Sequence, residues 1–294
     1  MDSTVVSQIA RSKTLRRVAL YSVGVAIYAV LPAALEDKHG DVNDMPGNVH
    51  AVFGLVLGWL LVFRTNSSYA RWWEARKLWG ALVNVSRNLA IKVADLCRAD
   101  EAELNKFRIE IVAFAWSLKD HLRNESSLQA VPGFEACHDT PSHVPSYLIT
   151  RMYEEFGTWK AEGSIDGDEL RILDAEARQF LDICGGCERI RNTRVVRSYR
   201  TFARQCVFLF LVTFPWGMAH TFGWLTVPLT GIVAYFMMGL ETVAEHVEEP
   251  FGYDEDDLDL DGLCETIGRT VQEVFDRRLD QKKAPIVTTP AADD

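Results

Sequence analysis

The stretch VHAVFGLVLGWLLVF, residues 49–63, decides the fold class. It contains no Asp, Glu, Lys or Arg. A helix that crosses the hydrocarbon core of a bilayer needs about 20 mostly apolar residues. The polar residues on either side of this stretch can complete that length at the membrane interfaces. The stretch therefore predicts a membrane-spanning helix over residues 48–63.

Three more apolar blocks accompany it, at residues 18–35, 202–219 and 223–241. The mean hydropathy of −0.03 hides this segregation of apolar from charged residues. The short gap between the last two blocks predicts a tight helical hairpin. A cleaved signal peptide is the alternative for the first block, because basic residues precede it. Signal cores are usually shorter, about 7–15 residues, and we interpret this block as a retained span.

The basic residues set the expected topology. They precede the first block, follow the second and precede the third, whereas residues 36–44 between the first two blocks are mostly acidic. Lys and Arg favour the cytoplasmic side. We therefore expect four spans in the cell (inner) membrane, both termini in the cytoplasm, a cytoplasmic insert at 64–200 and an acidic C-terminal segment at 248–294.

The cytoplasmic insert is expected to be helical. Apolar residues recur every three to four positions over 71–95, 107–122, 146–159 and 167–191, which is typical of helices that bury one face. Residues 124–146 are rich in Pro, Ser and His and predict a loop. No stretch has the pattern of a strand. The fold class predicted is thus all-α.

The second apolar block has two distinct faces. Leu55, Trp59 and Phe63 are four residues apart and stack on one face. Gly54 and Gly58 form a GxxxG pattern, typical of close helix packing, on a face rotated by about 100°. In a symmetric ring the glycines would pack on a neighbouring copy, and the apolar stripe would face the axis as a dewetting constriction. The alternative is a stripe that faces lipid.

Small polar residues directly follow the apolar stripe. Thr65, Asn66 and Ser67 come within one turn of Phe63. Polar side chains below an apolar constriction suit a vestibule for partly hydrated ions. We therefore interpret these residues as the lining of such a vestibule.

Three segments of the chain resemble the bacterial members of the bestrophin family. They are FRTNSSYARWWEARKLWG (63–80), GGCERIRNT (185–193) and GWLTVPLTGIVAYFMMGLETVAEHVEEPFGYDEDDLDLDGLC (223–264). The resemblance implies a homopentameric channel formed from one bestrophin-like domain over residues 1–294. It also implies that Leu55, Trp59 and Phe63 form the pore neck, where Trp59 replaces the usual Phe or Ile. A lower aperture is expected near residues 170–173.

The acidic run at 254–261 admits three interpretations. An EF-hand fails, because its twelfth position, a bidentate Glu, would be Gly268. A helix start is the simplest interpretation, since carboxylates favour a helix N-terminus. The resemblance implies a calcium clasp, although no cofactor is expected to be required. Its ligands would be the side chains of Asp254 and Asp257 and the main-chain carbonyls of Ala10, from a neighbouring copy, His246 and Glu249.

Two further function classes stay open. A membrane-embedded metal-dependent protein would use Cys184, Cys187, His138 and His143, although a single CxxC is a weak signal. The second class is a carrier or a membrane scaffold, and a carrier would place charges or broken helices at the bilayer midplane. No HExxH, nucleophile motif or nucleotide loop indicates an enzyme. The expected partners are other copies of the chain, the lipid bilayer and small inorganic ions, with no nucleic acid.

Within the channel hypothesis, the sequence leaves two alternatives for ion selectivity, anions and cations. Apolar rings do not choose the sign of an ion. The acidic outer loop, with Asp41 and Asp44, favours cations, whereas the inner arginines favour anions. Family-wide, the resemblance implies chloride conduction more often than cation conduction. We therefore expect small anions such as chloride, with a monovalent cation channel of the same fold as the alternative.

Overall fold

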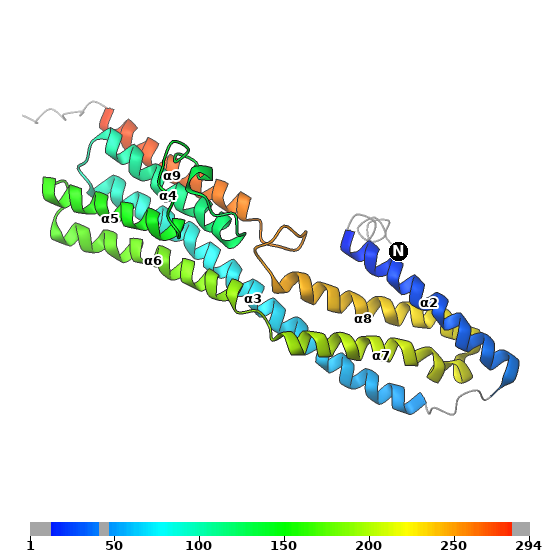
Figure 1. The fold of residues 1–294 in the computed structure, drawn as a ribbon. Coiled ribbons are helices and arrows are strands. Elements are labelled where there is room, and N and C mark those ends of the chain that lie inside the picture. The colour runs from blue at the N-terminus through cyan, green and yellow to red at the C-terminus, as the bar shows by residue number, and fades with distance from the viewer. Residues whose placement is uncertain (1–12, 41–46, 284–294) are drawn as a thin grey trace, which may run out of the picture. The chain divides into compact units, whose positions relative to one another are not determined.

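The computed structural model describes residues 13–40 and 47–283, and over these residues the protein is helical with no strand (Figure 1). This confirms the predicted all-α class. The helices are α2 (Lys13–His39), α3 (Gly47–Leu96), α4 (Glu101–Leu122), η1 (Leu128–Ala130), α5 (Val144–Glu162), α6 (Gly167–Asn192), α7 (Arg197–Phe222), η2 (Gly223–Leu225), α8 (Thr226–Glu248) and α9 (Leu260–Lys283).

Helix α3 is the longest element, with 50 residues. It begins with the apolar block, passes through the polar segment at 64–68 without a break, and continues over the helical pattern predicted at 71–95. Residues 59–79 contain no Pro or Gly. Nothing in this stretch therefore disfavours the continuous hydrogen bonding of the helix.

The chain forms two compact units. The apolar unit comprises residues Met1–Trp73 and Thr193–Asp257, and the insert unit comprises Glu74–Asn192 and Leu258–Asp294. The apolar unit thus contains α2, the first part of α3, α7, η2 and α8. The insert unit contains the rest of α3 with α4, α5, α6 and α9. The single bestrophin-like domain expected over residues 1–294 stays a prediction.

Within residues 13–40 and 47–283, three helical segments are long and apolar enough to cross a membrane: Thr14–Lys38, Val49–Leu96 and Arg197–Glu248. The third contains α7 and α8, which η2 joins into the predicted hairpin. Inside the unit, Leu57 and Leu61 of α3 pack with Phe210 and Phe214 of α7. Only 28%, 22% and 17% of the residues in the most apolar windows of these segments are buried, so most of their apolar surface faces outward.

The insert unit has a conventional buried core. Phe107 of α4 packs on Phe156 and Trp159 of α5, and Phe114 of α4 meets Phe180 of α6 edge to face at 4.9 Å. Helix α4 begins at a capping box. The Asp100 carboxylate accepts the amide of Glu103, and the Glu103 carboxylate accepts the amide of Asp100.

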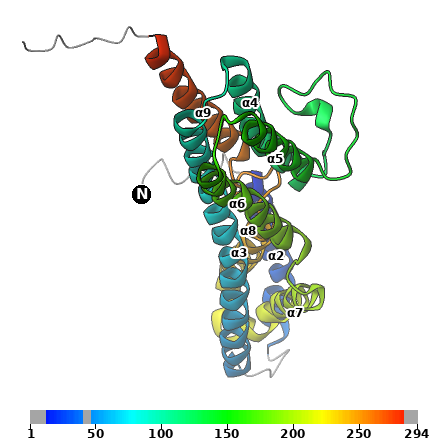
Figure 2. The ribbon, with the colours of Figure 1, turned by 90° about the vertical axis from the view of Figure 1, so that its left-hand side faces the viewer.

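The predicted loop connects α4 to α5 and carries η1 (Figure 2). It begins at Arg123 and ends at His143, the N-cap of α5. Its apolar residues Leu128, Val131 and Phe134 are buried against Ala113 and Leu148. The loop is therefore packed onto the unit, which its composition alone did not predict.

Candidate functional site

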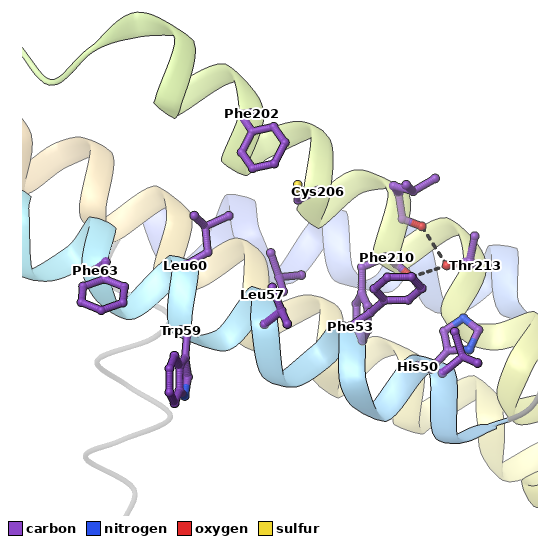
Figure 3. Close-up of a pocket in the computed structure, with 13 residues that line it drawn as sticks. His50, Phe53, Leu57, Trp59, Leu60, Phe63, Phe202, Cys206, Phe210 and Thr213 are labelled. Carbon is purple, nitrogen blue, oxygen red and sulfur yellow. Dashed lines mark hydrogen bonds between the residues drawn. The ribbon is translucent and has the colours of Figure 1, made fainter.

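The predicted neck residues lie on an uncovered face of α3. Leu55, Trp59 and Phe63 are 64%, 66% and 65% exposed, whereas Leu57 and Leu61 on the opposite face are 4% and 1% exposed. Figure 3 shows Trp59 pointing away from α7. Among the described residues, α3 thus presents a stripe of three large apolar side chains that are mostly uncovered, and the role of this stripe as a pore neck stays a prediction.

The polar residues below the stripe divide between two faces. Asn66 and Ser67 are exposed and continue the same face of α3, whereas Thr65 is half-buried and its hydroxyl donates to the carbonyl of Leu61 at 2.9 Å. Ser68 is buried, and its hydroxyl has no hydrogen-bond partner among the described residues. The geometry thus supports Asn66 and Ser67 as vestibule candidates better than Thr65.

The two glycines of the GxxxG pattern have different surroundings. A Cβ atom added at Gly54 would lie 3.5 Å from the ring of Phe210 in α7 of the same chain, whereas one added at Gly58 would meet no atom of the described residues within 4 Å. Gly54 therefore packs within the subunit. Only Gly58 is free to face a neighbouring copy, and its packing role stays a prediction.

An apolar groove runs between α3 and α7 (Figure 3). Phe53, Leu60 and Phe63 line it from α3, and Phe202 and Phe210 line it from α7. The groove borders the neck stripe, so the uncovered apolar surface of α3 extends to the neighbouring helix.

A buried charge cluster lies directly after the stripe, and sequence reasoning missed it. The side chain of Arg64 is 1% exposed, and its Nε lies 2.8 Å from Oε2 of Glu241 and its Nη2 3.9 Å from Oε2 of Glu248. Arg204 of α7 binds the other oxygen of Glu241 at 3.0 Å and also contacts Glu245. The sequence does carry a signal for this pair, because Arg64 and Glu241 are opposite charges at the ends of two apolar blocks.

Two side chains of the segment at 63–80 contact the main chain on either side of the Pro-Phe-Gly turn at residues 250–252. Arg71 donates from Nε to the carbonyl of Glu248 at 3.3 Å and also contacts the carbonyl of Thr193. Trp72 donates from Nε1 to the carbonyl of Asp256 at 3.0 Å. These two side chains therefore tie α3 to the main chain on both sides of that turn.

Comparison with known proteins decides the family. A family model described as bacterial/fungal bestrophin protein matches residues 2–273. The chain belongs to the bestrophin family. A voltage-dependent anion channel-forming protein of Mesorhizobium japonicum is 33% identical over 91% of this chain and 88% of its own length. A Synechocystis protein of the same description is 32% identical, over 83% of each chain.

Solved bestrophin structures share the fold. A point mutant of a bacterial bestrophin homologue from Klebsiella pneumoniae superposes with a TM-score of 0.79 at 25% identity, over 90% of this chain and 99% of that one. Another structure of a Klebsiella pneumoniae homologue gives a TM-score of 0.80 at 23% identity, over 89% and 98%. The helical architecture described above is thus the bestrophin fold.

Four of the five ligands expected for the calcium clasp lie among the described residues. Asp257 accepts the amide of Asp254 at 2.7 Å through Oδ2, and a Cβ atom at Gly252 would lie 2.7 Å from that same oxygen. The other oxygen, Oδ1, is buried and has no hydrogen-bond partner among the described residues. Burial raises the pKa of the Asp257 carboxyl to about 6, and the charges of Asp254 and Asp256 add to this.

These observations fit a cation near Asp257. A hard divalent ion would supply the partner that Oδ1 lacks, and carboxylate and carbonyl oxygens suit calcium. Asp254 is exposed, and the carbonyl of His246 already accepts the amide of Glu249 at 3.3 Å. Ala10 lies outside the described residues. The calcium clasp stays a prediction.

The remaining candidates are distributed over the insert unit. Cys184 and Cys187 are buried thiols, and burial raises the pKa of Cys184 to about 12 and also raises that of Cys187, which disfavours the thiolate that a metal needs. His138 is exposed, and His143 contacts Glu188. Near the expected lower aperture, Ile172 is 41% exposed, Leu170 is half-buried and Leu173 is fully buried, so Ile172 is the most exposed apolar side chain of this stretch.

Proposed function

We propose that the protein is a homopentameric ion channel that conducts small anions, such as chloride, through a neck lined by Leu55, Trp59 and Phe63. The observation that carries the proposal is the uncovered stripe on α3, where three large apolar side chains are about two-thirds exposed. A single α3 cannot enclose a pore. Copies arranged in a closed ring would bring their stripes to one axis, with heterologous contacts between neighbours.

Four membrane spans belong to this proposal: α2, the first part of α3, α7 and α8. Their apolar surfaces are mostly uncovered, which suits contact with lipid and with neighbouring subunits. The basic residues at their ends favour cytoplasmic termini and a cytoplasmic insert unit. In a bacterial cell, this arrangement corresponds to a multi-pass protein of the inner membrane.

Anion selectivity rests on the relatives. Two proteins about one-third identical to this chain, over most of its length, are described as voltage-dependent anion channel-forming proteins. Asn66 and Ser67 below the neck carry no charge and therefore impose no preference for cations. Calcium bound at Asp254 and Asp257 is a further part of the proposal, as a stabiliser of the segment around Gly252.

Current through the purified protein in a planar bilayer tests the function. Under a KCl gradient, an anion channel gives a reversal potential close to the equilibrium potential of chloride, and replacing chloride by gluconate on one side reduces the current carried from that side. A reversal potential at the equilibrium potential of potassium would establish the cation alternative. Absence of current from protein whose measured mass is pentameric would overturn the channel hypothesis.

A further inference from the structure

Two histidines and a glutamate, none of them part of the proposed neck or clasp, converge in the insert unit. Nε2 of His121 lies 2.7 Å from Oε1 of Glu188, and Nε2 of His143 lies 2.9 Å from the same oxygen. The two imidazole rings meet edge to face with centroids 4.6 Å apart. Three ligand atoms from three segments of the chain therefore lie within 4.8 Å of one another.

We propose that His121, His143 and Glu188 form a binding site for a divalent transition-metal ion, with Zn²⁺ as the best-suited ion. Two imidazoles and one carboxylate are a ligand set of zinc sites that keep a fourth position for water. Such an ion lies about 2.0–2.1 Å from each ligand, which separates neighbouring ligand atoms by about 3.3 Å in a tetrahedron. The two histidine–glutamate spacings, 2.7 and 2.9 Å, need to widen by about half an ångström, and the two histidine nitrogens lie within 4.8 Å of each other.

The surroundings suit an ion that enters from solvent. The side chains of His121, His143 and Glu188 are 16%, 31% and 31% exposed. Burial alone would raise the pKa of Glu188, but the bonds from the two histidines outweigh it and lower that pKa. The carboxyl is therefore charged at neutral pH, which is the form that binds a metal.

The main chain around the site is already held in place. His121 lies in the last turn of α4, and its carbonyl accepts Nη1 of Arg191 at 2.9 Å. His143 is the N-cap of α5, and Glu188 lies in α6. The site thus joins both ends of the loop at 123–143 to α6. A metal bound there would close this loop and stabilise the folded insert unit.

His143 has two roles that a substitution can separate. Its Nδ1 accepts the amide of Ser146 at 3.0 Å, and its Nε2 faces Glu188. Substituting Asn, which is a good N-cap residue, would keep the helix cap and remove the metal ligand.

Zinc titration of the tag-free, full-length protein in detergent at neutral pH tests the site. Calorimetry should show one Zn²⁺ per subunit, with an affinity that Glu188→Gln, His121→Ala and His143→Asn each weaken at least tenfold. The matched control is His138→Ala, which removes an exposed histidine of the same loop and should bind as wild type does. Calcium should not compete, because it prefers oxygen ligands.

Thermal melting provides a second readout that does not depend on conduction. Zinc should raise the melting temperature of the wild type and of His138→Ala, and should not raise that of Glu188→Gln or His143→Asn. Size-exclusion profiles without metal establish that each variant is folded and assembled. Equal zinc stoichiometry and affinity in the wild type and in all three ligand variants, or no zinc binding by the wild type, would overturn the proposal and leave the cluster as a hydrogen-bonded support.

Discussion

Nε of Arg64 lies 2.8 Å from Oε2 of Glu241, with 1% of the arginine and 10% of the glutamate side chain exposed. The contact is an ion pair without an aligned hydrogen bond, because the Nε–H has no hydrogen-bond acceptor among the described residues. It connects α3, one residue beyond Phe63, to the end of the apolar stretch of α8. A buried charge pair thus links α3 to α8 directly after the stripe of Leu55, Trp59 and Phe63.

Breaking this pair should destabilise the protein. Glu241→Gln leaves Arg64 buried with only the more distant Glu248, 3.9 Å away, and should cost about 3 kcal/mol. Adding Arg64→Met should recover part of that loss, because it removes the uncompensated charge. Arg171→Met, in an exposed pair with Asp168, is the control and should change stability by less than about 1 kcal/mol. Denaturation in detergent micelles gives the free energy of unfolding of the wild type and of the three variants. Equal stability of Glu241→Gln and the wild type would contradict the structure.

Shortening the neck should change conduction and leave the subunit stable. Replacing Leu55, Trp59 and Phe63 by Ala should raise the current several-fold and weaken its gating, since water would then fill the constriction. Thermal stability should stay close to that of the wild type, because all three side chains are mostly exposed within the subunit.

The buried face of the same helix provides the control. Leu61→Ala, at a site 1% exposed, should cost about 2–5 kcal/mol. Bilayer recordings and melting curves separate the two effects. A triple variant that conducts and gates as wild type does would mean that the stripe faces lipid.

The two glycines should respond differently. Gly54→Leu drives a side chain into Phe210 and should lower the melting temperature of the subunit. A Cβ atom at Gly58 meets no described atom within 4 Å, so Gly58→Leu should act only on assembly. Native mass measurement in detergent reports the oligomer. Pentamers of normal stability from Gly58→Leu would show that this face does not pack on a neighbour.

Calcium should act through Asp257 if the clasp forms. In the wild type, added calcium should raise the melting temperature, because the ion supplies the partner that Oδ1 of Asp257 lacks. Asp257→Asn should abolish the shift and Asp254→Asn should reduce it. Glu255→Gln changes an exposed carboxylate of the same run and should leave the shift intact. If calcium moves the melting curve of none of these proteins, the acidic run serves only as the start of α9.

Thiol labelling should follow burial. Cys137 is half-buried, whereas Cys184 and Cys264 are buried and burial raises the pKa of each to about 12. A maleimide should therefore modify Cys137 quickly in the folded protein and the other two slowly, because the thiolate is the reactive form. Peptide mass mapping measures the difference, and unfolding in denaturant should expose all six cysteines. Fast labelling of Cys184 in the folded state would contradict this picture.

The sequence alone determined the features that depend on local periodicity. Residues 49–63 predicted an apolar helix, and the spacing of Leu55, Trp59 and Phe63 predicted their shared face, since each residue of a helix advances it by about 100°. The hairpin of α7 and α8 followed from the short gap between two apolar blocks. The loop at 124–146 followed from its composition, and the structure confirms the class of each of these elements.

Only the tertiary structure decided which distant residues meet. Gly54 and Gly58 belong to one GxxxG pattern, yet an added Cβ atom would meet Phe210 only at Gly54. Arg64 pairs with Glu241, and His121 joins His143 and Glu188, across gaps in sequence that no helical period relates. Periodicity predicts which face of a helix is apolar, but it does not predict which other helix packs against that face. Side chains from different helices meet only after packing fixes the rotation and depth of each helix against the others.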